Sequence, residues 1–294
     1  QGYAAGYAAT MAVQAGCTPR EIDVRKLQEH LVEIGNLPES VLTDVDSFPL
    51  PEDAVAQAVR DFADESLTLD ERRIALAVVM SHKETALLHV RAAYGEVCVI
   101  DDPAPESRLE YAKLAGFLGL DDGVDDLIAA LDATEEWDLK ILQGAMAEYA
   151  HLPTPTDALV LALGYAGDPR ALPVLLEKLE MLDADVTLSH HRSIAIALEQ
   201  LADPSAAEPL ARLLRKADMS GHAMLELEPL HDADREKRRR TDPLREIVLA
   251  RALYRCGDYD NIGLDTLKTY QSDLRGLFSR HATAVLQADG QTNP

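Results

Sequence analysis

Apolar residues recur at intervals of three and four along most of the chain, which is the spacing of amphipathic helices. In residues 161–179, one apolar segment ends at Gly167, an Asp-Pro turn follows, and a second apolar segment begins. The second segment carries four leucines on one helical face: Leu172, Leu175, Leu176 and Leu179. Strict alternation is not sustained, and the best strand candidate, Val97–Ile100, is interpreted as an apolar connection or a helix end. The predicted class is all-α.

The helix-turn-helix plan of residues 161–179 returns elsewhere in the chain. Close copies occupy residues 111–131 and 194–214, and weaker copies occupy residues 74–94, turning near Ser81-His82, and residues 247–267. A single helical hairpin cannot bury its own apolar stripe, so the copies must stack, each touching chiefly its neighbours. The sequence therefore predicts an α-solenoid built from stacked helical hairpins.

The turn within each clear copy has residues suited to joining two helices. Gly167 is followed by Asp168 and Pro169, and Asp203-Pro204 stand at the same place in the next copy. Glycine tolerates the left-handed conformation that closes a helix, and aspartate accepts hydrogen bonds from the free N–H groups of the next one. Proline has a suitable φ for a first helical turn and no N–H that would lack a partner there.

Residues 162–175, Ala-Leu-Gly-Tyr-Ala-Gly-Asp-Pro-Arg-Ala-Leu-Pro-Val-Leu, resemble the HEAT-like repeats of the phycobilisome-lyase type. With its weaker copies, the resemblance covers roughly residues 71–286. Proteins of this type range from chromophore lyases to pure scaffolds. The resemblance therefore implies the fold, and one function compatible with it is a scaffold that binds a protein or peptide on its concave face. Long insertions at residues 134–155 and 216–242 interrupt the regular spacing.

The charge of the chain narrows the kinds of partner. In 294 residues, 51 acidic side chains exceed 28 basic ones, which gives a net charge of −23. Phosphate backbones and anionic membranes are repelled by such a chain, so neither nucleic acid nor membrane is expected as a partner. The three cysteines, Cys17, Cys98 and Cys256, are too far apart for a disulfide framework or a CxxC metal site, and we expect them to be buried.

Two segments near the start of the chain resemble the C-terminal end of the flavin-binding domain of FAD-dependent oxidoreductases. The first is a helix start rich in small residues, matched by Gly2, Ala4, Ala5 and Gly6. The second leads out of the domain and is matched by Pro19, Arg20, Asp23, Leu27, Gln28, Leu31 and Gly35. Tyr3 departs from the family, where glutamine is frequent at that position.

This resemblance implies a cofactor-binding role for Gly2, Ala4, Ala5 and Gly6 only when an N-terminal flavin-binding domain is supplied. The chain has no Gly-x-Gly-x-x-Gly fingerprint, so we expect it to bind no FAD alone and to be the C-terminal part of an FAD-dependent oxidoreductase. The alternative is a small-residue helix that packs closely on a neighbouring element. The expected organisation is a helical flavoprotein-like remnant over residues 1–36, a connecting helical segment over 37–70 and the repeat domain over 71–289.

Histidines and carboxylates supply the candidates for a different function. His190 and His191, which we place in a loop before a helix starting near Ser193, and His222 could form a catalytic site of a hydrolase or lyase in the solenoid groove. His222, Glu226 and His231 form a weak candidate set for a metal ion, because their spacing fits no established motif. The alternative for His190 and His191 is a solvated helix start.

One basic run, Lys237–Arg240, stands out in the acidic chain. Its alternatives are a solvated helix turn, an internal partner for acidic loops, or a site for a phosphate or an acidic partner.

Overall fold

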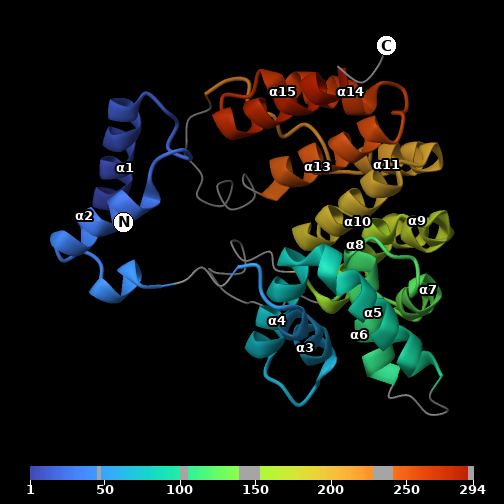
Figure 1. Ribbon diagram of the computed structural model, residues 1–294. Helices are drawn as coiled ribbons and strands as arrows, with labels where there is room; N and C mark the ends of the chain where they lie inside the picture. The colour runs from blue at the N-terminus through green and yellow to red at the C-terminus, as the bar shows by residue number, and fades with distance from the viewer. Residues whose placement is uncertain (45–47, 100–104, 139–152, 228–240, 291–294) are drawn as a thin grey trace. The chain divides into compact units, whose positions relative to one another are not determined.

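The computed structural model describes residues 1–44, 48–99, 105–138, 153–227 and 241–290. The chain divides into two compact units, residues 1–50 and 51–294, and each is described by itself. Every regular element within the described residues is a helix, so the predicted all-α class is confirmed (Figure 1). In the described ranges, none of the helices has the length and apolar character that crossing a bilayer requires.

The first unit consists of two helices and a short 3₁₀ turn: α1 (Gly2–Ala15), α2 (Val24–Glu33) and η1 (Glu39–Leu42). Gly16 has φ of 65° and ends α1, while the Asp23 side chain accepts from the backbone N–H of Lys26 and begins α2. The rings of Tyr7 and His30 stack with their centroids 3.9 Å apart, which joins the two helices.

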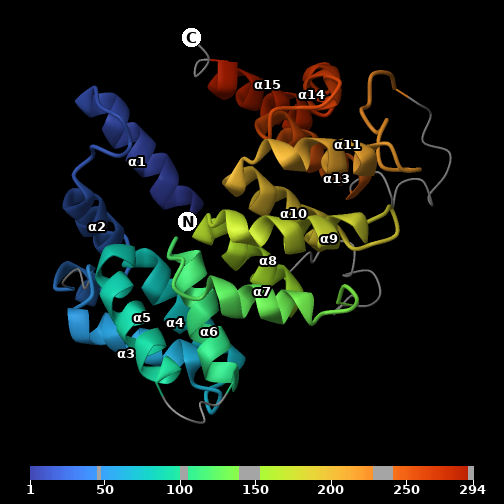
Figure 2. The same ribbon diagram turned by 90° about the vertical axis from the view of Figure 1, so that its right-hand side faces the viewer.

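The second unit contains the repeats, whose hairpins are confirmed. Its first helices are α6 (Pro105–Phe117), α8 (Pro155–Ala166), α10 (Leu188–Leu201) and α13 (Thr241–Arg255). The second helices are α7 (Val124–Asp132), α9 (Leu172–Glu180), α11 (Ala207–Leu214) and α14 (Ile262–Gln271). Consecutive first helices pack side by side, and α7, α9 and α11 form a second layer (Figures 1 and 2). The terminal helix α15 (Gly276–Gly290) covers α14. This arrangement is the predicted solenoid.

The start of this unit departs from the hairpin plan. α4 (Leu69–Ser81) and α5 (Lys83–Cys98) meet at His82, as the sequence predicts, but α4 packs chiefly on α3 (Glu52–Ala63), and α5 packs on α3 and α6. Thus α3 belongs to the packed unit. The apolar run at Val97 is the end of α5, as interpreted from the sequence. Cys98 lies there and is exposed, and Cys17 is half-buried, so the prediction of buried thiols holds for Cys256 alone.

The turns within the repeats have the predicted chemistry. Gly167 ends α8 with φ of 69°, and the Asp168 side chain accepts from the Arg170 N–H at 2.8 Å as the 3₁₀ turn η3 (Pro169–Ala171) begins. Asp203 does the same for η4 (Pro204–Ala206), accepting from the Ser205 N–H at 2.8 Å. At this second turn the left-handed position is occupied by Ala202, with φ of 49°.

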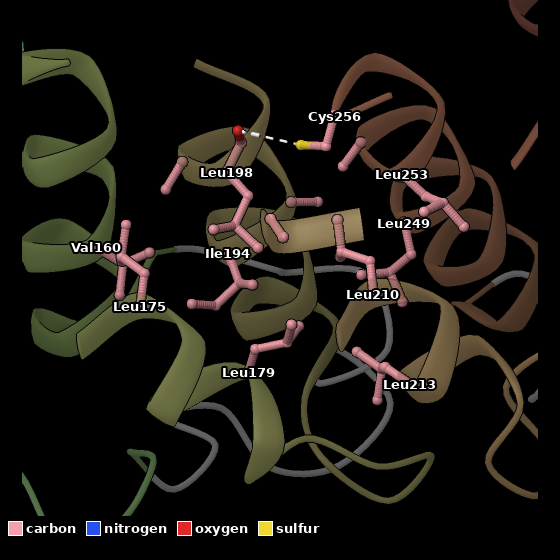
Figure 3. Packing of buried hydrophobic residues seen from close by; sticks show 14 of the residues in the cluster. Val160, Leu175, Leu179, Ile194, Leu198, Leu210, Leu213, Leu249, Leu253 and Cys256 are labelled. Carbon is pink, nitrogen blue, oxygen red and sulfur yellow. Dashed lines mark hydrogen bonds between the residues drawn. The ribbon is translucent and has the colours of Figure 1, made fainter. Parts of the chain in front are cut away.

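Apolar side chains from consecutive hairpins form one continuous core (Figure 3). Members of this core from four successive helices include Val160, Leu175, Leu179, Ile194, Leu198, Leu210 and Leu213. The core continues onto α13, where the Cys256 thiol donates to the carbonyl oxygen of Leu198 at 3.4 Å. Burying each large aliphatic side chain contributes roughly 1.5 to 3 kcal/mol, so each hairpin depends on its neighbours for stability.

Small residues allow the first helices to approach one another closely. A Cβ atom added at Gly116 on α6 would lie 2.5 Å from the Ala162 carbonyl oxygen on α8. One added at Gly164 on α8 would lie 2.4 Å from the Ala197 Cα on α10. Because protein interiors are close-packed, there is no space at these two positions for a side chain.

Candidate functional site

The buried polar cluster at the N-terminal ends of α8 and α10 contains the first sequence candidate, His190. Thr154 and Asp157 form a capping box at the start of α8, with the Asp157 carboxylate accepting from the Thr154 N–H at 3.0 Å. The other Asp157 oxygen accepts from His190 Nδ1 at 2.8 Å and from the Ser193 hydroxyl at 2.7 Å. His190 Nε2 lies 3.0 Å from the Asp138 carbonyl oxygen. The cluster therefore joins two successive repeats.

Both nitrogens of the His190 ring face hydrogen-bond acceptors, which favours the protonated ring. Burial by itself lowers the pKa of His190, but the Asp157 carboxylate and the Asp138 carbonyl outweigh it and raise this pKa above its ordinary value. For Asp157, burial by itself raises the pKa of the carboxyl group. The hydrogen bonds from His190, Thr154 and Ser193 outweigh burial and lower this pKa below its ordinary value. The pair is a buried ion pair with 1% of either side chain exposed.

Asp, His and Ser together are the residue types of a nucleophilic triad, but the hydrogen bonds among them are arranged differently here. The Ser193 hydroxyl donates to Asp157 and not to the His190 ring, which carries no free lone pair for proton abstraction. Trp137 stacks on the ring with centroids 4.5 Å apart. The geometry favours a brace between α8 and α10 over an acid–base site.

His191 is completely buried on α10, which begins at Leu188 rather than near Ser193. The predicted loop is therefore the first turn of a helix, and the alternative of a solvated helix start is wrong. The ring nitrogens of His191 face the carbonyl oxygens of Thr187 at 3.1 Å and Asp183 at 2.9 Å. These two carbonyl groups raise the pKa of His191, but burial and the charges of Arg245 and His190 outweigh them and lower it to about 4, so the ring is neutral near pH 7.

His222 lies in the segment between α11 and α13. Its Nε2 faces the Asp218 carbonyl oxygen at 3.0 Å within the same segment. His190, His191 and His222 have no hydrogen-bond partner in common among the residues that the structure describes. A joint catalytic role for the three histidines stays a prediction without geometric support.

The metal candidates are only partly within the described residues. His222 and Glu226 are described, whereas His231 and the basic run Lys237–Arg240 lie outside the described residues. Within the described ranges, no group of three histidine, cysteine or acidic side chains is placed to hold a metal ion.

The four residues to which the flavoprotein resemblance gives a cofactor-binding role, Gly2, Ala4, Ala5 and Gly6, all lie on α1. A Cβ added at Gly2 or Gly6 would meet no atom within 4 Å, and Val13 further along α1 is 83% exposed. This helix presents small and apolar residues to open space. A cofactor-binding role for the four residues stays a prediction.

A second polar network, around Glu246 on α13, was not found from the sequence. The Glu246 carboxylate is buried and accepts from the backbone N–H groups of Gly221 and His222, each at 2.8 Å, and from the Tyr270 hydroxyl at 2.7 Å. Neighbouring Arg245 donates to the Asp218 carbonyl oxygen at 2.9 Å. These charges hold residues 218–222 in place. Adjacent opposite charges in a helix resemble a solvated face, so the sequence carries no sign of their burial.

A shallow groove of about 420 Å³ lies along the turns that end α6 and α8. It is lined by Arg91, Gly119, Leu120, Asp121, Ala166, Gly167, Asp168 and Pro169. The sequence signal for this groove is the repeated Gly and Asp at the turns, which is also the signal of a structural turn.

Comparison with known proteins supports the repeat. Residues 157–181, which span most of α8, the turn and α9, match the family model of the PBS lyase HEAT-like repeat. No curated protein matches the sequence. Taken with the stacked helical hairpins, the match identifies the second unit as containing a HEAT-like repeat within an all-α solenoid.

Proposed function

We propose that this chain is a non-catalytic HEAT-like scaffold that binds a protein or peptide, and that it forms the C-terminal part of an FAD-dependent oxidoreductase. The scaffold role is carried by the stacking of successive hairpins into an extended core. The described histidine candidates are held in internal hydrogen bonds, which agrees with this role. Repeats that stack in this way provide long binding surfaces.

The flavoprotein connection is supported by two features of the first unit. The first segment of the resemblance lies on the helix α1, whose N-terminal turn is open. A helix N-terminus provides free N–H groups for an anionic or carbonyl-rich cofactor. The same helix exposes 54% of Tyr3 and 83% of Val13, which is typical of a surface that another element covers.

The scaffold role is tested by selecting peptides from a random displayed library on the immobilised chain and mapping the selected peptides by NMR. We expect peptides that bind at one defined surface of the repeat unit. Failure to select any peptide, or binding of every peptide through the unfolded chain, would contradict the scaffold role.

The flavoprotein connection is tested separately. We expect the chain alone to be colourless and to show no change in melting temperature with FAD. Co-expression with the polypeptide encoded immediately upstream is expected to yield a yellow complex that retains FAD. Stabilisation of the isolated chain by FAD, or an upstream sequence without a strand and glycine-rich phosphate loop, would contradict this part of the proposal.

A further inference from the structure

The short segment of residues 134–138, which follows α7, reaches the buried His190 ring at two points. The Asp138 carbonyl oxygen lies 3.0 Å from His190 Nε2. The Trp137 ring stacks on the imidazole with the centroids 4.5 Å apart and an angle of 27° between the planes. A cation over the face of an aromatic ring is attracted to it, so protonation of the imidazole strengthens this stack. Both contacts therefore depend on the charge of one side chain.

Loss of the proton would leave the His190 ring with one N–H for two acceptors. Nδ1 faces the Asp157 carboxylate at 2.8 Å, and Nε2 faces the neutral carbonyl group of Asp138. A hydrogen bond to an ionised acceptor is roughly twice as strong as one to a neutral acceptor, so the remaining proton stays on Nδ1. The lone pair of Nε2 then faces the lone pairs of the Asp138 oxygen, and that hydrogen bond is lost. The neutral ring also attracts Trp137 less strongly.

The indole of Trp137 gives an independent reason for release. Its Nε1–H is buried and has no hydrogen-bond partner within the described part of the chain. A buried donor without a partner is unfavourable, and release of the ring would expose this N–H to water. Trp137 is thus held by apolar packing and by its stack on His190, and not by an indole hydrogen bond.

We propose that His190 acts as a pH-sensitive latch, which holds Trp137 against α10 while the imidazole is protonated and releases it when the proton is lost. The release is local, because the Asp138 carboxylate also accepts from the Thr156 N–H of α8 at 2.8 Å, and this bond does not involve the imidazole. The latch needs neither a partner nor a cofactor. It therefore goes beyond the proposed function, and its failure would leave that function untouched.

The charged groups around the His190 ring set the direction of the switch. Among the described residues these are Asp157 on α8, Asp138 on the segment itself and His191 on α10, which is neutral near pH 7 because its pKa is about 4. Lys178 on α9 donates to a backbone carbonyl group of the segment. Burial opposes the charge of His190, but the two aspartates outweigh burial and hold its pKa above the ordinary value. The charged form is therefore kept below the ordinary histidine pKa and is lost as the pH rises through the raised value.

The test follows the fluorescence of Trp137, which is the single tryptophan of the chain. The full chain is titrated from about pH 5 to about pH 9, on both sides of the ordinary histidine pKa, with excitation at the red edge of the indole band, where tyrosine does not absorb. A protonated imidazole quenches a stacked indole, so the emission is expected to rise with pH. The acrylamide quenching constant is expected to rise in the same transition, because the released indole is open to solvent. The far-ultraviolet circular dichroism is expected to stay constant, since the repeats remain folded.

Two variants assign the transition to one side chain. His190→Gln can form hydrogen bonds but has no proton to lose in this pH range, so the rise in acrylamide quenching is expected to disappear. His222→Gln is the matched control and is expected to keep the transition, because the described partner of His222 is a carbonyl oxygen of its own segment. In the wild-type chain, the midpoint of the transition is expected to equal the pKa of the His190 ring measured by NMR. This comparison needs no substitution and remains decisive if His190→Gln does not fold.

Four results would overturn the proposal. The emission could rise without any change in acrylamide quenching, which would mean loss of the proton without release of the indole. The midpoint could differ from the pKa of the His190 ring, or the transition could persist in folded His190→Gln, and either result would assign it to another group. The helical circular dichroism signal could fall in the same transition, which would mean that the repeats unfold.

Discussion

The close approach of α8 to α10 at Gly164 allows a direct test of the fold. Gly164 on α8 faces Ala197 on α10, and a Cβ atom added to it would lie 2.4 Å from the Ala197 Cα and 2.7 Å from its Cβ. The Ala197 Cα belongs to the helix backbone, so a rotamer change cannot relieve its overlap with the added Cβ. For Gly164→Ala, α10 would have to move by roughly 1 Å to restore ordinary contact in a close-packed interior.

The expected change in the free energy of unfolding is the difference between two opposing effects. Overpacking of a well-packed interior costs about 1 to 3 kcal/mol, and a clash with backbone belongs at the upper end of that range. Alanine gains about 1 kcal/mol over glycine in a helix interior, which partly offsets the cost. We therefore expect Gly164→Ala to lower the free energy of unfolding by about 2 kcal/mol.

The matched control is the same substitution in a helix with open surroundings. A Cβ added at Gly95, within α5, meets no atom within 4 Å. Only the helix propensity changes there, so Gly95→Ala is expected to raise the free energy of unfolding by about 0.5 to 1 kcal/mol.

The assay is urea unfolding of the chain followed by far-ultraviolet circular dichroism. The change in the free energy of unfolding is read from the urea midpoint, provided that the slope of this free energy against urea concentration is the same in both proteins. Opposite shifts of the two midpoints are expected. If Gly164→Ala is as stable as the wild-type chain while Gly95→Ala is stabilised, the reasoning about close helix approach is refuted.

Three further predictions concern turns, buried histidine and the second polar network. Ala202→Gly relieves a left-handed alanine and is expected to raise the urea midpoint by the equivalent of about 1 kcal/mol, whereas Gly167→Ala lowers it by a similar amount. The pKa of His191 is about 4 in the folded chain and about 6.5 in the unfolded chain, so the unfolded chain binds the proton first as the pH falls. About 3 kcal/mol of the free energy of unfolding is therefore lost between pH 6.5 and pH 4. His191→Gln is expected to remove this loss from urea midpoints measured across the same pH range. Tyr270→Phe removes a hydrogen bond to buried Glu246 and is expected to cost about 1.5 to 3 kcal/mol by urea unfolding; an unchanged midpoint would exclude that bond.

The repeats could be predicted from the sequence because their information is local. Helical spacing of leucines and the Gly-Asp-Pro turn depend on neighbouring residues only, and the structure places α8, η3 and α9 accordingly. The pairing of α4 with α3 could not be predicted in this way. Apolar spacing marks a helical face but does not name the helix that covers it, and the segment before α4 lacks the repeat spacing.

The candidate sites depended on non-local contacts and were harder to predict. Neighbouring histidines at 190 and 191 resemble a catalytic pair in sequence. The His190 ring, however, is held by Asp157 and Asp138, and the His191 ring by the carbonyl groups of residues four and eight positions before it. The partner of His190, Asp157, is 33 positions earlier in the chain. No local pattern indicates that the aspartate capping one helix also binds a histidine of the next repeat.

The same contacts limit what the buried histidines can bind. A buried polar group is stable when all of its hydrogen bonds are made, and such a group has no capacity left for a ligand. His190, whose two ring nitrogens face Asp157 and Asp138, is in this state. A partner that bound to the His190 ring would first have to break one of these internal hydrogen bonds.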